Sequence, residues 1–551
     1  MAGSDPIQDP LDDALAGSPD NGRVGAGQWM ALAAALLGWM FDGAEMGVFS
    51  MVGRTALKDL MPGMPEGDVG FWFGVITALF LVGAATGGVL FGWLGDRIGR
   101  VRAMTLSVLV YALFTGLCGV ANAAWPVALL RLVGWEHGAE MMSSVGAAWQ
   151  VGLMRFIAAL GMGGEWSLGV ALVMEVWPNR SRALMAGLIG AAANVGYLLV
   201  GVIGLQLKNF LGEMRTLLVD VGMSHDWVEM LTANQGWRLM MLMGTLPALL
   251  TFLIRIFVPE SEKWQHEKDK GSTSNWETKD LLGVIVGGLG PILIVYVWSA
   301  DVGLPARIVG SIAGLVIATC GYTWPVVRFL HRQGGGTQAE SREIRQTLKR
   351  MLLAACLSGV ALLGTWAGTQ WIPTWADQLT NSNAALGAKE HTQMWLAFGA
   401  IVGTIAAAML GDWIGRRPAY TVLCVISFFS ILGVFQLNHE FGTPLLVWSF
   451  ISGACTASFY GWLPLYLPEL FKTSFRATGQ GFSFNFGRIL AAVGALQTGT
   501  LMGVFKNDIP LAGFTIKGGY PLACSVMSAV YLFGIVIIWF LPETRGKPLP
   551  E

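Results

Sequence analysis

Two copies of one short charged motif, far apart in the chain, limit what this protein can fold into. The first copy is Gly-Trp-Leu-Gly-Asp-Arg-Ile-Gly-Arg at 92–100, and the second is Gly-Asp-Trp-Ile-Gly-Arg-Arg at 411–417. Each copy lies between two long apolar runs, which predicts a tight loop between two membrane-spanning helices. Glycines let two helix ends approach closely, and the alternating charges offer ion pairs there. One copy alone is weak evidence, whereas two copies in matching positions indicate a duplicated bundle.

The composition agrees with a membrane protein. Hydrophobic residues make up 54% of the 551 residues and charged residues 13%, against about 25% charged in a typical soluble domain. The net charge of −1 gives no reason to expect a nucleic-acid partner. The six cysteines occur singly, without the spacing of a disulfide framework or a metal site, so we expect no cofactor and no bound metal.

We therefore expect an all-α polytopic membrane protein with fourteen spans. Six spans are expected in an N-terminal half (29–258), two in an extra hairpin, and six in a C-terminal half (351–543). The hairpin (281–329) lies within a charged linker (259–350), and polar tails (1–28 and 544–551) flank the halves. The expected spans are 29–52, 70–93, 103–122, 147–177, 183–207, 237–258, 281–300, 308–329, 351–373, 394–410, 419–437, 444–467, 478–504 and 520–541.

The hairpin and the orientation need separate arguments. Each apolar run of the hairpin is long enough to span, although a hairpin that lies on the membrane or re-enters it is an alternative. With both termini in the cytoplasm, most of the 35 Lys and Arg residues fall in cytoplasmic segments, as the positive-inside rule requires.

Further paired motifs support two homologous halves. Six residues separate Glu175 from Arg182, and the same number separates Glu469 from Arg476. Pro-Glu-Ser at 259–261 ends the first half, and Pro-Glu-Thr at 542–544 ends the second. Three signatures repeated in one order indicate an internal duplication.

These motifs resemble those of the major facilitator superfamily, with the Glu-x6-Arg and Pro-Glu-Ser/Thr motifs closest to its sugar-porter and organic-anion branches. The resemblance implies two six-helix bundles that rock between inward-open and outward-open states. It implies a gating role for a set of charged residues, although these charges also simply anchor helix ends and set topology. The second copy departs from the pattern at Trp413, where the first has Arg97. The implied gating residues are Asp96, Arg97, Arg100, Glu175, Arg182, Asp412, Arg416, Glu469 and Arg476.

Two carboxylates in the first span are the predicted proton-coupling residues. Asp42 and Glu45 are three residues apart and share a helix face. An ionised side chain at mid-membrane costs roughly 2.5–3.5 kcal/mol, so a pair there needs a reason. Two such groups close together favour binding a proton, which a proton-coupled carrier requires. Asp-Gly-x-Glu resembles the Asp-Gly-x-Asp of aromatic-acid/proton symporters. The alternative is that both carboxylates pair permanently with arginines.

Charged and polar residues in four other spans are the predicted substrate contacts. Arg155 and Glu165 are ten residues apart and not on one face, so we expect no direct pair between them. The segments around Arg155 and Arg488 resemble sialate/monocarboxylate and aromatic-acid symporters, in which arginines matter for anionic substrates. The full predicted set is Arg155, Glu165, Gln370, Trp371, Asn485 and Arg488. Cavity walls are also expected from Trp366, Thr369, Pro373, Tyr460, Trp462, Pro464, Tyr466 and Asn194.

The leading functional hypothesis is proton-coupled symport of a small organic anion, such as a monocarboxylate, an aromatic acid or a sialate-like molecule. A proton-coupled sugar or polyol porter is the alternative, and a non-transporting membrane sensor is a third. An enzyme is not expected, because no nucleophile–base pair, metal cluster or nucleotide loop lies in a span. We expect a monomer in a bacterial inner (plasma) membrane whose partners are the substrate, protons and the lipid bilayer.

Overall fold

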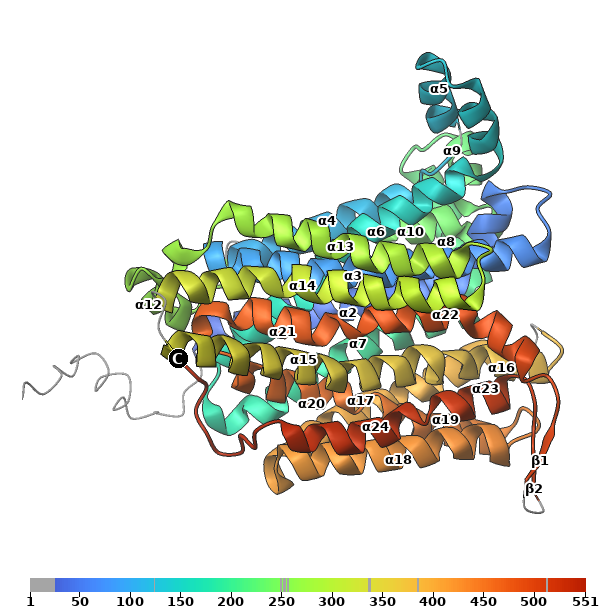
Figure 1. Ribbon diagram of the computed structural model, residues 1–551. Coiled ribbons are helices and arrows are strands. Elements are labelled where there is room, and N and C mark those ends of the chain that lie inside the picture. The colour runs from blue at the N-terminus through green and yellow to red at the C-terminus, as the bar shows by residue number, and fades with distance from the viewer. Residues whose placement is uncertain are drawn as a thin grey trace, which may run out of the picture.

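The computed structural model is a bundle of long, roughly parallel helices (Figure 1). It describes residues 25–551 except 123, 248–249, 251–253, 255–256, 335–337, 384–385 and 512–513. Within this part of the chain, eleven helices are long and apolar enough to cross a membrane. The predicted all-α membrane fold is therefore confirmed, while the expected tail at 1–24 lies outside the described residues.

The N-terminal half consists of the helices that precede residue 260. Its long helices are α2 (Ala26–Leu60), α3 (Glu66–Ile98), α4 (Arg100–Cys118), α6 (Glu136–Val176) and α7 (Arg182–Leu205). Its shorter elements are α5 (Ala124–Leu132), η1 (Asn179–Ser181), α8 (Leu207–Asp220), α9 (His225–Thr232), η2 (Asn234–Gly236) and α10 (Trp237–Met243). The remainder of the expected sixth span, 244–258, lies partly outside the described residues.

The C-terminal half repeats the bundle with more interrupted helices. It comprises α15 (Gln338–Ala367), η5 (Thr369–Trp371), α16 (Ile372–Leu379), α17 (Ala388–Ile414), α18 (Arg416–Leu437), α19 (Thr443–Thr456) and α20 (Phe459–Tyr466). It continues with η7 (Leu467–Leu470), η8 (Thr473–Phe475), α21 (Arg476–Asn485), α22 (Gly487–Val504), strands β1 (Ile509–Leu511) and β2 (Phe514–Ile516), α23 (Tyr520–Met527), α24 (Val530–Ile537) and η9 (Ile538–Phe540).

Between the halves lie α12 (Glu262–Asp269), η3 (Ser272–Asn275), η4 (Thr278–Asp280) and the hairpin of α13 (Leu281–Ser299) and α14 (Leu304–Gly334). Glycines form the seam within the hairpin, where a Cβ added to Gly287 would lie 2.5 Å from the Tyr322 ring. The opposite face of α13 exposes Leu282, Ile285 and Leu289. A helix with one glycine-packed face and one exposed apolar face suits a lipid-facing position.

The hairpin also packs against both halves, because α13 lies beside α3 and α22. Thr86 of α3 and Tyr322 of α14 share a hydrogen bond of 2.7 Å between their hydroxyl oxygens. At one end of the hairpin, Trp276 Nε1 donates to the carbonyl of Ser474 at 3.3 Å. The hairpin therefore joins the two halves as well as interrupting them.

Several helix ends differ from the expected spans. Helix α2 begins at Ala26, α6 at Glu136 rather than 147, and α15 at Gln338 rather than 351. Apolar runs locate only the part of a helix inside the hydrocarbon, whereas backbone hydrogen bonding continues through polar turns beyond it. The expected spans 444–467 and 478–504 are each broken into two helices. At the second break, a Cβ on Gly487 would lie 2.4 Å from the Cα of Gly359, so the chain approaches α15 too closely for another residue.

The halves meet along two seams. Helix α17 packs on α7, and α21 and α22 pack on α3. The contact is close at the second seam, where a Cβ on Gly92 would lie 2.6 Å from the carbonyl oxygen of Ala477.

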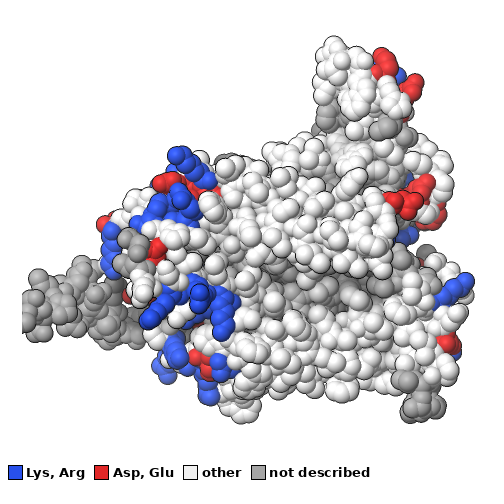
Figure 2. Space-filling model, in the orientation of Figure 1, with Lys and Arg blue, Asp and Glu red and all other residues white. Residues whose placement is uncertain are grey.

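The two ends of the bundle differ in charge. Lys and Arg gather at the end where α12 and the first turns of α15 lie, here called the basic end (Figure 2). The opposite end carries α5, α16 and the β1–β2 ribbon (Figure 1).

Candidate functional site

At the basic end, the repeated motifs of the first half converge on one buried arginine. Arg100 donates to Glu175 through Nη2 at 3.1 Å and Nε at 3.3 Å, and to the Gly95 carbonyl at 2.9 Å. Its Nη1 lies 3.1 Å from Asp96 Oδ1, and Arg100, Asp96 and Glu175 all have fully buried side chains. The hydroxyl of Ser261 donates to Glu175 at 2.5 Å. Motifs separated by more than 150 residues thus form one network.

The second half contains the same network at matching positions. Arg416 donates to Glu469 at 2.6 and 3.0 Å and to the Gly411 carbonyl at 2.7 Å. Thr544 takes the place of Ser261 and donates to Glu469 at 2.6 Å. Asp412 lies 3.4 Å from Arg416 but has 56% of its side chain exposed. The three paired signatures therefore share one structural purpose, which is to fix the ends of the helices in each half.

In the part of the chain that the structure describes, hydrogen bonds from the first network also hold the two halves together. Asp96 Oδ2 accepts hydrogen bonds from the backbone N–H and hydroxyl of Thr478, at 2.8 and 2.6 Å, at the start of α21. Arg476 donates to Glu175 at 2.8 Å, and Arg100 donates to the Thr473 carbonyl at 2.7 Å. These contacts close the basic end of the bundle.

Two predicted gating residues lie outside this network. Arg97 donates to the Thr278 hydroxyl at 2.9 Å and stacks over Trp93, so it contacts the segment before the hairpin. Arg182 interacts electrostatically with Glu469 and Glu175, but its Nε atom has no hydrogen-bond partner among the described residues.

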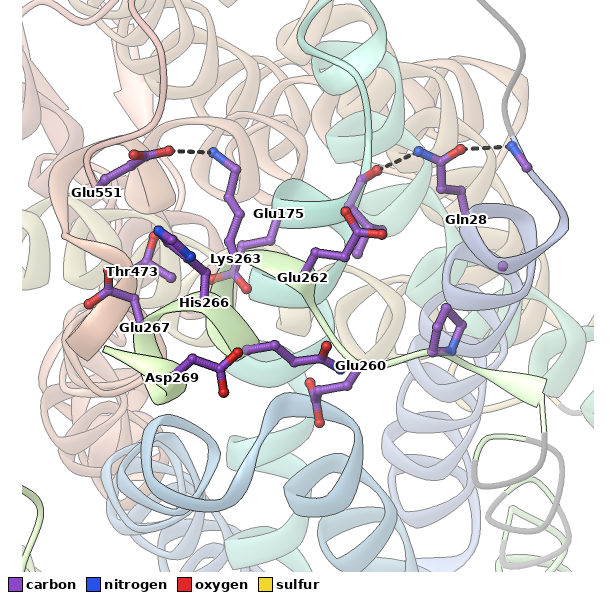
Figure 3. Close-up of a pocket in the computed structure, with 15 residues that line it drawn as sticks. Gln28, Glu175, Glu260, Glu262, Lys263, His266, Glu267, Asp269, Thr473 and Glu551 are labelled. Carbon is purple, nitrogen blue, oxygen red and sulfur yellow. Dashed lines mark hydrogen bonds and ion pairs between the residues drawn. The ribbon is translucent and has the colours of Figure 1, made fainter. Parts of the chain in front are cut away.

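A large pocket of about 570 Å³ lies beside this network, between α12, the start of α2 and the last residues of the chain (Figure 3). Figure 3 shows Lys263 reaching Glu551, to which it is paired at 3.3 Å. The pocket does not suit an anion, because the six carboxylates that line it outnumber its two basic side chains. The acidic residues are Glu175, Glu260, Glu262, Glu267, Asp269 and Glu551.

The predicted proton-coupling residues are divided between two buried clusters. Glu45 forms a direct ion pair with Arg155, and Thr115 donates to Glu45 at 3.5 Å. The guanidinium of Arg155 also lies over the rings of Phe49 and Phe80, at 4.1 and 4.6 Å from their centres. Among the described residues, the ion pair of Arg155 is with Glu45.

The second cluster joins the two halves. Asp42 interacts electrostatically with Glu165 of the same half and Arg488 of the other. One oxygen each of Asp42 and Glu165, and two guanidinium nitrogens of Arg488, have no hydrogen-bond partner among the described residues. Asn485 donates to the Gly163 carbonyl at 3.1 Å, which places it on the seam.

Aromatic rings separate the interior from the closed basic end. Trp166 of α6 stacks on Phe484 of α21, with ring centres 3.6 Å apart and planes within 8°. Trp39 and Tyr460 lie against this pair.

On the other side of the Glu45–Arg155 pair, a cavity of about 90 Å³ lies between the halves near the opposite end. Of the predicted substrate contacts, Arg155, Gln370 and Trp371 line this cavity, together with the expected wall residues Trp366 and Pro373. Glu165, Asn485 and Arg488 do not, because they lie deeper in the seam. The other lining residues are Met46, Phe49, Ser50, Phe73, Gly74, Thr77, Phe80, Tyr197, Thr374, Lys389 and Gln393.

Three hydrogen bonds cross between the halves around this cavity. Gln370 Nε2 donates to the Ser50 hydroxyl at 3.4 Å, and Lys389 Nζ donates to the Ser50 carbonyl at 3.3 Å. Gln393 donates to the Tyr197 carbonyl at 3.1 Å. The sequence analysis missed Ser50, Tyr197, Lys389 and Gln393. The mid-membrane charge rule did not find Lys389, because it precedes the apolar run of its span.

The remaining wall candidates lie elsewhere. Thr369 donates to Thr456 at 3.0 Å, and Asn194 donates to the Gly190 carbonyl at 2.9 Å. Trp462, Pro464 and Tyr466 are buried within the second half. In the part of the chain that the structure describes, no group of three His, Cys, Asp or Glu residues is placed to hold a metal ion.

Comparisons with known proteins identify the family and the fold. The family model for "Sugar (and other) transporter" matches residues 29–281 and 304–546, leaving out most of α13. A probable 4-methylmuconolactone transporter from Cupriavidus pinatubonensis is 26% identical over 92% of this chain and 89% of its own length. A cis,cis-muconate transport protein from Acinetobacter baylyi is 22% identical over 93% and 96%. The solved proton:xylose symporter XylE has a TM-score of 0.60 and 19% identity, covering 95% of this chain and 98% of its own.

Proposed function

This chain belongs to the sugar (and other) transporter family of the major facilitator superfamily, and we propose that it is a secondary transporter that moves a small organic anion together with protons. The transporter class follows from the family. The anion, the proton coupling and the roles of individual residues are our proposal.

The basic end faces the cytoplasm, since loops rich in Lys and Arg remain on that side. Eleven helical segments that are long and apolar enough to span, together with three shorter or broken ones (α10, α19–α20 and α21–α22), support a count of fourteen spans. In this proposal the Asp96 and Glu175 contacts close the cytoplasmic end, and the cavity lies on the outward side.

The observation that carries the proposal is the chemistry of the cavity wall. It includes two cationic side chains, Arg155 and Lys389, and no carboxylate. Six aromatic residues form much of the remainder, namely Phe49, Phe73, Phe80, Tyr197, Trp366 and Trp371. A cavity with positive charge and flat apolar walls suits an organic acid with an aromatic or unsaturated skeleton. Two relatives whose names specify muconate or methylmuconolactone support this choice.

The Glu45–Arg155 pair provides a route from proton binding to anion binding. While Glu45 is ionised, it neutralises the arginine that lines the cavity. A proton on Glu45 leaves Arg155 with an uncompensated charge, which is costly in a buried site unless an anion binds. Proton and anion therefore favour each other, and this coupling is reciprocal. Asp42 and Glu165 supply a second carboxylate pair beside Arg488, where the halves separate.

The test is reconstitution into liposomes with an inward-directed proton gradient. Labelled aromatic acids, aliphatic monocarboxylates and hexoses are supplied in parallel, with and without a protonophore. We expect uphill uptake of an acid that the protonophore abolishes. Proton-driven uptake of a hexose with none of the acids would replace the organic-anion assignment by the sugar-porter alternative. Exchange of an acid that does not respond to the proton gradient would support the organic-anion assignment and contradict the proton coupling.

A further inference from the structure

Lys389 stands where the C-terminal half reaches the cavity. It is the second residue of α17, and its Nζ donates to the carbonyl of Ser50 on α2, across the seam. It lines the same cavity as Arg155, which belongs to α6 of the N-terminal half. The two cations of the cavity therefore come from opposite halves.

The charge of Lys389 is available to a ligand. A lysine ammonium has three N–H donors, and only the bond to the Ser50 carbonyl is formed among the described residues. Glu390 and Asp377 act on Lys389 electrostatically, but neither forms an ion pair with it. Glu390 packs toward Gly204 of α7 instead.

Arg155 offers a different environment. Its guanidinium lies over Phe49 and Phe80 and is paired with Glu45, so it forms the inner part of the cavity wall. Lys389 sits at the end of its helix, nearer the opposite end of the bundle. The rings of Phe73, Tyr197 and Trp371 line the same space.

We propose that the substrate is a dicarboxylate with a flat unsaturated or aromatic skeleton, one carboxylate bound by Arg155 and the other by Lys389. This inference rests on the proposed organic-anion function and narrows it. A dianion of this shape is bound by a cation from each half, whereas a monoanion held by Arg155 is bound by a cation of one half only. Closure of the halves around the substrate then depends on the second carboxylate.

The probes are terephthalate and 4-methylbenzoate, which share a ring and one carboxylate and differ in a second carboxylate or a methyl group. Binding is measured on the full-length transporter in lipid nanodiscs for the unaltered protein, Lys389→Gln and Lys389→Arg. Lys506→Gln is the matched control, since Lys506 is exposed near the same end and does not line the cavity.

We expect the unaltered protein to bind terephthalate at least about tenfold more tightly than 4-methylbenzoate, because the second carboxylate accepts a charge-assisted hydrogen bond from Lys389. Lys389→Gln should bring this affinity ratio close to one, Lys389→Arg should restore most of it, and Lys506→Gln should leave it unchanged.

Each other outcome has a definite meaning. Equal affinity of the unaltered protein for the two acids overturns the dicarboxylate inference and keeps the organic-anion function. If Lys389→Gln loses affinity for both acids equally and the affinity ratio is preserved, Lys389 is a structural residue and the inference is also overturned. Binding of neither acid, with hexoses tested alongside, overturns the proposed function itself.

Discussion

Asp96 of α3 caps the first turn of α21 across the seam, accepting hydrogen bonds from Thr478 N–H at 2.8 Å and from the Thr478 hydroxyl at 2.6 Å. The aspartate at the matching position of the second half, Asp412, makes no such contact and is half exposed. The aspartate of the first copy therefore contacts the other half, whereas the aspartate of the second copy does not among the described residues.

Asp96→Asn should shift the transporter toward the state that is open at the basic end. The substitution removes a buried negative charge from a helix N-terminus, a contribution of about 1 kcal/mol or more, which is a fivefold change in the equilibrium. Spin labels at exposed Arg102 and Lys349, in a background without native cysteines, report the separation of the halves. Asp412→Asn is the control and should leave the distance distribution unchanged. An identical response of both variants would contradict the asymmetry described here.

Asp42→Asn should abolish proton-driven accumulation while leaving exchange of substrate across the membrane largely intact. Asp42 lies in the second buried cluster with Glu165 and Arg488, and an amide there cannot carry the proton. Uptake against a gradient and counterflow are measured in the same liposomes. Asp301→Asn, in the exposed turn of the hairpin, should behave like the unaltered protein. Uphill accumulation by Asp42→Asn would show that this residue is not essential to coupling.

Arg488→Gln should slow transport far more than it weakens binding from outside. Arg488 does not line the cavity that contains Arg155 and Lys389 but interacts electrostatically with Asp42 between the halves. We expect the external affinity for the acid to change by about twofold or less, while turnover falls by at least about tenfold, since Asp42 then lacks its buried partner. Binding to nanodiscs and initial rates in liposomes separate the two effects. A large loss of external affinity would place Arg488 in the outward site.

Removal of the hairpin, by joining Ser274 to Ser341, should leave a transporter that inserts and exchanges substrate. The gating networks and the cavity wall contain no residue of α13 or α14. Thermal stability should fall, because the Thr86–Tyr322 and Trp276–Ser474 hydrogen bonds that join it to both halves are lost. Tyr322→Phe, which removes one of these bonds, should cost only about 1 kcal/mol. A folded deletion variant without any exchange would show that the hairpin belongs to the mechanism.

Glu260 and Glu543 occupy matching positions in the two halves and should respond to pH in opposite directions. Burial raises the pKa of Glu260 from 4.5, despite backbone N–H bonds from Arg100 and Val101. Burial acts the same way on Glu543, but backbone N–H bonds from Arg416 and Arg417 outweigh it and hold the pKa of Glu543 below 4.5.

A raised pKa in the folded state stabilises at low pH, and this contribution disappears as pH rises through that pKa. A lowered pKa stabilises above the unfolded value and is lost as pH falls. The unfolding temperature of the unaltered protein relative to Glu260→Gln should therefore fall as pH rises above about 4.5. The unfolding temperature of the unaltered protein relative to Glu543→Gln should instead rise as pH increases toward about 4.5. Parallel curves would contradict the opposite pKa directions.

The repeated motifs predicted the family and most members of the two charged networks, because paired charges that recur in one order must meet for a structural reason, but Arg97 and Arg182 lie outside the hydrogen-bonded networks. They did not predict which network crosses the seam. Asp96 and Asp412 follow a glycine in nearly the same sequence context, and their difference arises from what packs opposite them. Arg97, the residue replaced by Trp413 in the second copy, contacts the linker and not the gate.

The cavity was only partly predictable. The cost of a charge in the membrane identified Arg155, Asp42 and Glu45 as candidates. It does not specify which of these side chains form pairs, because the Glu45–Arg155 ion pair depends on the packing of α2 against α6. Lys389 was not predicted, because a charged residue at the end of a helix, outside the apolar run, is not unusual in a membrane protein. Helix ends beyond the hydrocarbon, such as the start of α6, were not predicted either, because the apolar run ends before the helix does.

The Trp166–Phe484 stack has a consequence for the energy supply of the cell. Its two rings belong to different halves and meet face to face in the middle of the protein, with buried carboxylates nearby. A file of water molecules through that point would let protons run inward without cargo and dissipate the membrane potential. If the halves separate as proposed, the rings part and meet again in each cycle, and the stack would act as a barrier to protons that opens and closes with each turnover. Replacing Trp166 and Phe484 by smaller side chains should convert a coupled carrier into a slow proton conductor.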